Sequence, residues 1–250
     1  MQKNEREREI INILKDNDGF VTVRELCKLL YASESSVRRD LTVLEGRGII
    51  NRTHGGAELI TNFSNVVAFS KRTHHNTAAK KAIAKKAATL IRDGNVIFLD
   101  QSSTSFYLAN EIMNNNTLTV ITNNIEILSL MSDTGIKTMS SGGMLYSENR
   151  VCLVGPDAQY IFENSYADIM FFSTKSLTDD GGIWDPSREE VLIRNSMLRN
   201  AAKRVFLCDS EKFGTNSAYK QCTLDDVDIL VSENDDGKRF KNVAKNLIVM

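Results

Sequence analysis

The sequence predicts a two-domain α/β protein, in which a small helical domain closed by a hairpin precedes a larger domain built on a parallel sheet. Three observations support this prediction. Residues 5–44 place apolar side chains at a helical period in short segments. Residues 49–59 hold two short apolar runs on either side of a glycine pair, as in a hairpin. Beyond residue 93, short apolar runs alternate with helical stretches, which is typical of strands joined by crossover helices.

The first domain begins with three predicted helices. Residues 5–15 form the first, and residues 23–30 form the second, because Thr22 and Glu25 have the spacing of a capping box. Ser33 caps the third after a very short turn. Two helices joined so closely indicate a helix-turn-helix. The apolar residues expected to face its core are Leu26, Leu29, Leu30, Val37, Leu41 and Leu44.

The other face of the third helix carries side chains suited to DNA. Arginines read guanine edges or pair with phosphate, and small hydroxyls reach either. The hairpin that follows has Arg52 and His54 near its tip. It is predicted to be a wing that contacts phosphate or the minor groove. An alternative is that Arg38 and Arg39 are ordinary solvent-exposed residues of a surface helix and bind nothing. We therefore expect residues 1–58 to be a winged helix-turn-helix that binds double-stranded DNA, with these candidate contact residues: Thr22, Ser33, Ser35, Ser36, Arg38, Arg39, Thr42, Arg52 and His54.

Residues 59–75 lack a clean period, and we expect them to be a linker. The charge is unevenly distributed around it. Residues 1–58 are neutral, residues 59–92 carry seven basic residues and no acid, and residues 93–250 have a net charge of −8. A polyanion is thus attracted to the first part of the chain and repelled by the rest. A helix is predicted over residues 76–91, and its lysines, at positions 80, 81, 85 and 86, are either a solvated face or a supplementary phosphate surface.

The remainder, residues 76–250, is predicted to be an effector-binding and oligomerisation domain with a parallel α/β fold. Ligands bind such folds beyond the carboxyl ends of the strands, where loops lead into helices. The expected strands are 96–99, 118–121, 136–139, 169–172, 205–207, 229–231 and 247–250. The expected helices are 104–114, 123–132, 156–164 and 187–202.

Several of these strand ends carry groups that suit an anion. Hydroxyls and free backbone N–H groups at a helix N-terminus receive phosphate, and glycines let a ligand approach the backbone. Lys175 and Lys212 supply the positive charge that a phosphate monoester requires. Each loop alone is better explained by helix capping, and their convergence on one edge favours a ligand site. The candidate effector-binding residues are Asp100, Ser102, Ser103, Thr104, Thr122, Asn123, Gly142, Gly143, Lys175, Glu190 and Lys212.

The runs from Val23 to Leu26, from Ser33 to Leu41 and from Arg52 to Ala57 resemble the DeoR family of bacterial repressors. The resemblance covers almost the whole chain. It implies a sensor domain similar to ribose-5-phosphate isomerase and the CoA-transferases, which responds to phosphorylated sugars. The matching positions in that domain are 100–104, Thr122, Asn123, Gly142, Gly143, Gly155, Glu190 and 209–214.

The chain also departs from the family pattern. Ser102 stands where the family usually has glycine, and we expect this change to restrict the anion loop. Residues 173–176 replace a common Gly-x-Asp-Gly pattern, and Arg194 stands where lysine is frequent. These changes concern the effector, because they leave the fold and the DNA-binding residues untouched.

The sequence favours a transcriptional regulator, expected to repress a carbohydrate-metabolism operon under the control of a phosphorylated sugar. Matching repeated half-sites requires a homo-oligomer, either a dimer or a tetramer. An alternative is a sugar-phosphate isomerase with a DNA-binding module, in which Asp100 or Glu190 acts as acid or base and Lys212 stabilises an enediolate. A third reading is a regulator that has lost its ligand.

No apolar run is long enough to span a membrane, and the N-terminus does not have the apolar core of a signal peptide. The four cysteines are scattered without a metal or redox spacing. We therefore expect a cytoplasmic protein with no metal and no cofactor.

Overall fold

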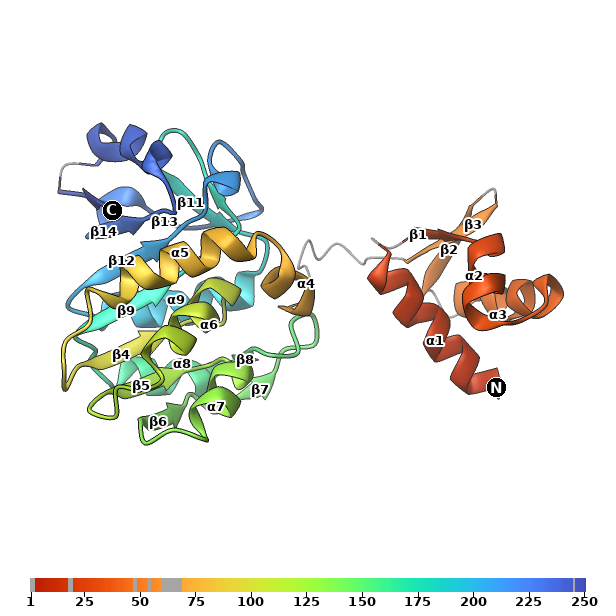
Figure 1. The fold of residues 1–250 in the computed structure, drawn as a ribbon, viewed down its shortest axis with the longest axis horizontal. Helices are drawn as coiled ribbons and strands as arrows, with labels where there is room; N and C mark the ends of the chain where they lie inside the picture. The colour runs from red at the N-terminus through yellow and green to blue at the C-terminus, as the bar shows by residue number, and fades with distance from the viewer. Residues whose placement is uncertain (1–2, 18–19, 47–48, 54, 60–68, 245) are drawn as a thin grey trace. The chain divides into compact units, whose positions relative to one another are not determined.

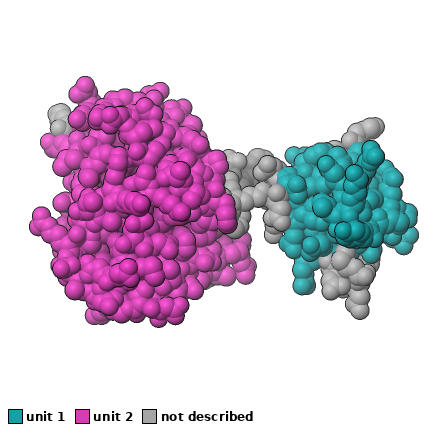
Figure 2. Space-filling model, viewed as in Figure 1, with its two compact units in different colours: residues 1–65 teal, residues 66–250 magenta. Residues whose placement is uncertain are grey.

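The computed structural model describes residues 3–17, 20–46, 49–53, 55–59, 69–244 and 246–250. The chain divides into two compact units, Met1–Asn65 and Val66–Met250 (Figure 2). Each unit has a hydrophobic core of its own.

The first unit packs three helices against a small antiparallel sheet (Figure 1). Val37, Leu41 and Leu44 face its core, as expected from their helical spacing. Leu29 was expected in the core as well, but this was wrong, because 55% of its surface is exposed. The elements are α1 (Lys3–Asp16), β1 (Phe20–Thr22), α2 (Val23–Leu30), α3 (Glu34–Gly46), β2 (Ile50–Thr53) and β3 (Gly56–Leu59), and the strand order is β1-β3-β2.

Two contacts of this unit are not apparent from the sequence pattern. Strand β1 pairs with β3, with Val21 opposite Ala57, so the wing is a three-stranded sheet rather than a lone hairpin. On α3, Asp40 is buried among the apolar residues and accepts a hydrogen bond from Arg6 of α1. Because this ion pair joins α1 to the inner face of α3, it helps fix the orientation of α3.

The second unit begins before residue 76. Helix α4 (Phe69–His74) falls in the range expected to be a linker, so that expectation does not hold for residues 69–75. Phe69 packs edge-to-face against Phe106, with ring centroids 5.8 Å apart, and the Tyr107 hydroxyl donates to the Thr73 carbonyl at 2.9 Å. Helix α4 is polar apart from Phe69, and it is held by these tertiary contacts rather than by an apolar period.

A seven-stranded parallel sheet forms the centre of the second unit, and all seven predicted strands are confirmed. Its order is β15-β14-β12-β9-β4-β5-β6. The strands are β4 (Val96–Leu99), β5 (Thr119–Thr122), β6 (Lys137–Ser140), β9 (Ile169–Phe172), β12 (Arg204–Leu207), β14 (Ile229–Val231) and β15 (Ile248–Val249).

Helices cover both faces of this sheet (Figure 1). Residues alternate between the faces, since Phe98 packs in one apolar cluster and Ile97 and Leu99 in the other. One face carries α5 (Thr77–Ala88), α6 (Ser103–Ile112) and α7 (Ile125–Met131), and the other carries α8 (Pro156–Glu163) and α9 (Arg188–Arg199).

Two smaller sheets and three short 3-10 helices complete the unit, and none of them was predicted. The first sheet orders β10 (Ser176–Leu177), β11 (Gly182–Asp185) and β13 (Tyr219–Thr223) as β10-β11-β13. The second is a hairpin of β7 (Met144–Leu145) and β8 (Leu153–Val154). The 3-10 helices are η1 (Ser210–Lys212), η2 (Leu224–Asp226) and η3 (Asp235–Asn242). In the part of the chain that the structure describes, no helix combines the length and apolarity needed to cross a bilayer.

Candidate DNA-binding surface and effector site

Helix α3 presents a polar face to solvent. Arg38, Arg39 and Thr42 are exposed, whereas Val37 and Leu41 on the opposite side are buried. The side chain of Arg38 pairs with Glu34 one turn earlier, with 2.7 Å between Nη2 and Oε1. An exposed pair of this kind contributes little to stability, so Arg38 can exchange Glu34 for a phosphate or a base at small cost.

The wing lies against this same face. Arg52 of β2 donates from Nη1 to the Thr42 hydroxyl at 2.9 Å, and its backbone N–H donates to Glu45 Oε1 at 3.2 Å. The wing arginine and the exposed face of α3 therefore form one polar surface. That surface can approach a groove and its flanking phosphates at the same time.

Two of the predicted DNA contacts serve as helix caps in this structure. Thr22 accepts a hydrogen bond from the Glu25 backbone N–H at 3.2 Å and donates its hydroxyl to Glu25 Oε2 at 2.7 Å, which confirms the capping box. Ser33 Oγ accepts from the Ser36 backbone N–H at 3.4 Å and lies 3.1 Å from the Ser35 hydroxyl. Thr22 thus begins α2, and Ser33 begins α3, the helix that carries the polar surface. His54 lies outside the described residues.

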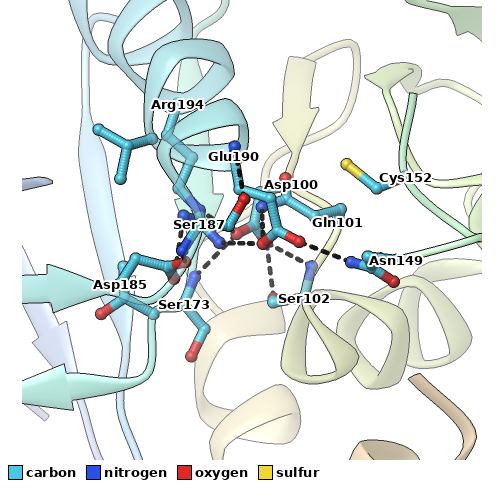
Figure 3. A network of polar contacts seen from close by, with 12 residues as sticks. Asp100, Gln101, Ser102, Asn149, Cys152, Ser173, Asp185, Ser187, Glu190 and Arg194 are labelled. Atoms are coloured by element: carbon cyan, nitrogen blue, oxygen red, sulfur yellow. Dashed lines mark hydrogen bonds and ion pairs between the residues drawn. The ribbon is translucent and has the colours of Figure 1, made fainter. Parts of the chain in front are cut away.

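In the second unit, Asp100 is buried at the carboxyl end of β4 with all of its acceptor capacity in use (Figure 3). Its Oδ1 accepts from the backbone and hydroxyl of Ser102 and from the Ser105 hydroxyl, and its Oδ2 accepts from Ser173 N–H and Arg194 Nε. A carboxylate with five donors has no lone pair left for a ligand. Asp100 thus organises the loop, and its contact with the effector stays a prediction.

The loop after Asp100 does not require glycine at position 102. Ser102 has φ −73° and ψ 152°, an extended conformation open to any residue, and its hydroxyl caps α6 by accepting from Ser105 N–H at 3.1 Å. The expected restriction from losing glycine is therefore absent. Ser103 and Thr104 form the buried first turn of α6, where backbone N–H groups lack intrahelical partners.

Arg194 of α9 lies at the centre of a buried ionic network (Figure 3). Its guanidinium contacts three carboxylates: Asp100 at 2.8 Å, Asp185 at 3.1 Å and Glu190 at 3.2 Å. Burial lowers the pKa of Arg194, but the three negative charges outweigh burial and raise it. Burial also raises the pKa of Asp185, against the opposing charge of Arg194. Sequence reasoning noted Arg194 only as a departure from the family and did not find this role.

Amide side chains surround Glu190 and leave oxygens without partners. Gln101 and Asn149 each donate to a Glu190 oxygen at 2.7 Å (Figure 3). Asn123 donates to Gln101 Oε1 at 3.3 Å. The Oδ1 atoms of Asn123 and Asn149 are buried and accept no hydrogen bond from a described residue. Since a buried acceptor without a donor is unfavourable, both atoms mark positions where a hydroxyl can donate.

Cations gather beside this network. Lys212 donates from Nζ to Ser173 Oγ at 2.8 Å and lies 3.2 Å from Asp209 Oδ2. Lys80 of α5 is only 4% exposed and donates to the His75 carbonyl, so it is not part of a solvated lysine face. Burial, with the nearby charges of Lys212 and Arg72, lowers the pKa of Lys80 to about 8. Lys80 and Lys212 thus repel each other, although the Asp209 carboxylate acts on both, and a further anion beside them would reduce that repulsion.

The remaining predicted residues have different surroundings. Thr122 Oγ1 accepts from Asn124 N–H at 3.1 Å and so supports the turn into α7. Gly143 has φ +94°, and an added Cβ would lie 2.5 Å from the Val154 carbonyl oxygen, so close packing already explains this glycine. Gly142 is exposed with φ +65°. Lys175 is exposed between buried neighbours, which places its side chain outside the network.

A cavity of about 600 Å³ lies next to the loop after β12, but its charges do not suit a phosphate. Its one cation, Arg239, already pairs with Asp179 at 2.8 Å. Three acidic side chains share the lining, which consists of Ser210, Glu211, Phe213, Asp235, Asp236 and Arg239.

Comparison with known proteins agrees with this division into two units. A family model described as a DeoR-like helix-turn-helix domain matches residues 6–63, and one described as the DeoR C terminal sensor domain matches residues 75–234. The transcriptional regulator GolR of Listeria innocua is 35% identical over 231 residues, which is 92% of this chain and 90% of the relative.

Two other relatives are similar over comparable lengths. The L-fucose operon activator of Haemophilus influenzae is 31% identical over 90% of both chains, and the transcriptional repressor GlcR of Bacillus subtilis is 31% identical over 93% of this chain and 89% of its own. Among solved structures, ribose 5-phosphate isomerase A of Methanocaldococcus jannaschii overlaps 54% of this chain and 53% of its own, with 21% identity and a TM-score of 0.40.

The named relatives are regulators of transcription, and they favour that function over the isomerase alternative. One family model matches the unit that carries the polar face of α3, and the other matches the unit that contains the buried network. The chain therefore belongs to the DeoR family of DNA-binding transcriptional regulators.

Proposed function

We propose that this regulator represses a carbohydrate-metabolism operon and that a sugar phosphate bound in the second unit modulates its affinity for DNA. The observation that carries the proposal is the two-sided polarity of the buried site. Lys80 and Lys212 supply positive charge within electrostatic range of each other, and Glu190 with its amide partners supplies hydrogen-bond acceptors. A sugar phosphate has the same two-sided chemistry, with a dianion at one end and hydroxyl donors at the other.

Ser173 joins the two sides of the site. Its backbone N–H donates to Asp100 at 3.2 Å, and its hydroxyl accepts from Lys212 at 2.8 Å. We place the phosphate between Lys80, Lys212 and the first turn of α6, where free N–H groups and the helix dipole favour an anion. The sugar hydroxyls would then donate to the unpartnered Oδ1 atoms of Asn123 and Asn149.

The same geometry opposes the isomerase alternative. A general base must have a lone pair directed at the proton it removes, and Asp100 accepts five hydrogen bonds. Glu190 accepts from Gln101, Asn149 and Arg194. Both carboxylates are arranged to hold the site in place rather than to exchange protons.

For DNA binding we propose that Arg38, Arg39, Thr42 and Arg52 make direct contacts, together with Ser35 and Ser36 at the start of α3. Thr22 and Ser33 are assigned to capping. The second unit would join copies of the chain, and binding to the chromosome would place the protein in the cytoplasm. A ligand changes DNA affinity only if it binds two arrangements of the protein with different affinity.

Two measurements test the proposal. Thermal unfolding of the full chain is followed with glucose 6-phosphate, fructose 1-phosphate, ribose 5-phosphate and glycerol 3-phosphate, and with the matching unphosphorylated compounds. A binding partner at 100 times its Kd raises the free energy of unfolding by about 2.7 kcal/mol, and the unphosphorylated controls should have no effect.

The second measurement is fluorescence anisotropy with the upstream region of the gene, with and without the stabilising compound. We expect sequence-specific binding that the compound changes. Binding no stronger than to competitor DNA would refute the regulator, and the absence of any phosphate-dependent stabilisation would refute the effector. A reporter fused to the upstream region separates repression from activation, since deletion of the gene raises expression only in the first case.

A further inference from the structure

We infer that Arg72 of α4 is an effector-binding residue that holds the phosphate of the ligand. Because α4 is the first helix after residues 60–68, bound phosphate would connect this helix to the rest of the effector site. This inference rests on the proposed function. It assigns a role to a helix in the part of the chain that the sequence pattern marked as a linker.

The first observation is that Arg72 has donors with nothing to bind. Its Nε and Nη2 atoms are buried and have no hydrogen-bond partner among the described residues. A guanidinium is always charged and carries its N–H donors in a planar fork. Buried N–H donors without an acceptor are unfavourable, so these two donors are suited to bind the oxygens of a ligand.

The second observation is that the guanidinium is held in place by its flat face. The Arg72 Cζ lies 5.5 Å from the centroid of the Phe69 ring, a cation–π contact one turn earlier in α4. Phe69 is itself 9% exposed and fixed edge-to-face on Phe106 of α6. Stacking on the ring leaves the N–H edge of Arg72 available, and two parallel N–H groups bind two oxygens of a phosphate.

The third observation is the position of this charge. Arg72 acts electrostatically on Lys80 and also on Cys152 and Asp185, which belong to the buried network. It therefore lies within electrostatic range of both the cationic residues and the buried network. Helix α4 reaches this position because Tyr107, in α6, holds the Thr73 carbonyl at 2.9 Å.

The geometry gives the ligand a direct connection to the linker. Helix α4 begins at Phe69, and strand β3 of the wing ends at Leu59, so only residues 60–68 separate the two elements. A phosphate held by Arg72, Lys80 and Lys212 would join α4 to α5 and to the loop after β12. Binding would thus stabilise α4 in its docked position, and the occupied and empty states would differ at the start of the linker.

The test uses the full chain, inorganic phosphate as the probe, and sodium chloride at matched ionic strength to correct for screening. Arg72→Gln removes the charge and keeps a polar side chain of similar reach. We expect its Kd for phosphate to rise about ten- to a hundredfold, the range for one charge-assisted interaction. Arg72→Lys should recover part of the loss. Arg92→Gln removes an exposed arginine from the same unit and should leave the Kd unchanged.

A second readout separates ligand binding from a purely structural role. Amide hydrogen exchange across residues 69–75 should slow in the wild type when phosphate is added, and should not slow in Arg72→Gln at the same concentration. Melting of Arg72→Gln without phosphate should match that of the wild type. Binding of phosphate by the wild type and by Arg72→Gln with equal Kd would overturn this inference alone. Failure of the wild type to bind any phosphate compound would overturn the proposed function and the inference with it.

Discussion

At the scale of single residues, the second unit is organised by charges that are buried together. Arg194 is 1% exposed and reaches three carboxylates from its Nε, Nη1 and Nη2 atoms. A lysine in its place would have one ammonium group and could not contact three separate acceptors with the same geometry. Arg194→Lys should therefore change the arrangement of Asp100, Asp185 and Glu190, and with it the shape of the buried network.

Arg39 gives the most direct test of the DNA surface. It is exposed on α3 and makes no ion pair with any residue that the structure describes. Arg39→Ala should weaken binding to the upstream DNA by roughly 1 to 3 kcal/mol and leave thermal unfolding unchanged. Fluorescence anisotropy measures the loss. Arg8→Ala, at an exposed arginine of α1, is the matched control, and an equal loss in both variants would show only a general effect of charge.

Lys80 predicts how effector binding depends on pH. Its pKa of about 8 in the free protein reflects burial and the charges of Lys212 and Arg72, against the opposite effect of Asp209 and Glu211. A bound anion stabilises the protonated form, so binding takes up a proton once the pH exceeds 8. A phosphate monoester is fully dianionic above pH 7 and adds no dependence of its own.

Affinity for the most strongly stabilising sugar phosphate should therefore be level between about pH 7 and 7.5 and fall about tenfold by pH 9. Lys80→Met, which has no charge to lose, should bind weakly with no slope across this range. Lys81→Met, at an exposed neighbour on α5, should keep the wild-type slope. Calorimetric titrations at several pH values measure all three, and parallel profiles for Lys80→Met and the wild type would contradict the assignment.

At the scale of elements, α2 depends on the residue that caps it, Thr22. Thr22 begins α2 through the capping box and pairs with Gly56 in the wing sheet, so it lies where the helix and the wing meet. Thr22→Ala should destabilise the first unit by about 1 kcal/mol. Thr22→Ser keeps the capping hydroxyl and should retain both stability and DNA affinity. A loss of DNA affinity in Thr22→Ser with unchanged unfolding would instead indicate a direct contact through the threonine methyl.

Some secondary-structure elements were predicted from the sequence, and others were not. Central strands of the parallel sheet were found because burial on both faces makes them continuous apolar runs, as in Ile169–Phe172. Strand β10 has two residues, and β13 is mostly polar, so neither forms such a run. Helix α4 and its Arg72 were assigned to a linker because a single apolar residue, Phe69, gives no period.

The candidate site was likewise predicted only where the sequence pattern is clear. Its strand-end residues were predicted because chain order places them at one edge of the sheet, as for Asp100 and Asn123. Their partners come from distant segments whose patterns carry no such signal. Asn149 lies between β7 and β8, and Lys80 lies in a helix where it resembles the exposed Lys81. Which lysine turns inward is decided by packing against the loop after β12.

At the scale of the whole molecule, the charge distribution favours DNA contact through the beginning of the chain. Residues 59–92 carry seven basic residues and no acid, and residues 93–250 carry −8. A polyanion is thus repelled by most of the second unit. That unit also exposes apolar side chains, among them Met144 at 66% and Tyr160 at 64%, which suit contact with another protein surface better than contact with water.

We therefore predict that the protein is a homo-oligomer joined through the second unit. Light scattering after gel filtration should give a mass two or four times the 28.0 kDa of one chain, and a mass of one chain would contradict the prediction. In an oligomer, the spacing of the two α3 helices fixes the separation of the half-sites in the operator at a whole number of helical turns. Inserting about 5 base pairs between the half-sites turns one of them to the opposite face of the duplex, and should reduce binding to that of a single half-site. Inserting about 10 base pairs returns the half-site to the original face of the duplex but moves it farther away. Partial recovery of binding would therefore measure how far apart the first units of the oligomer can reach.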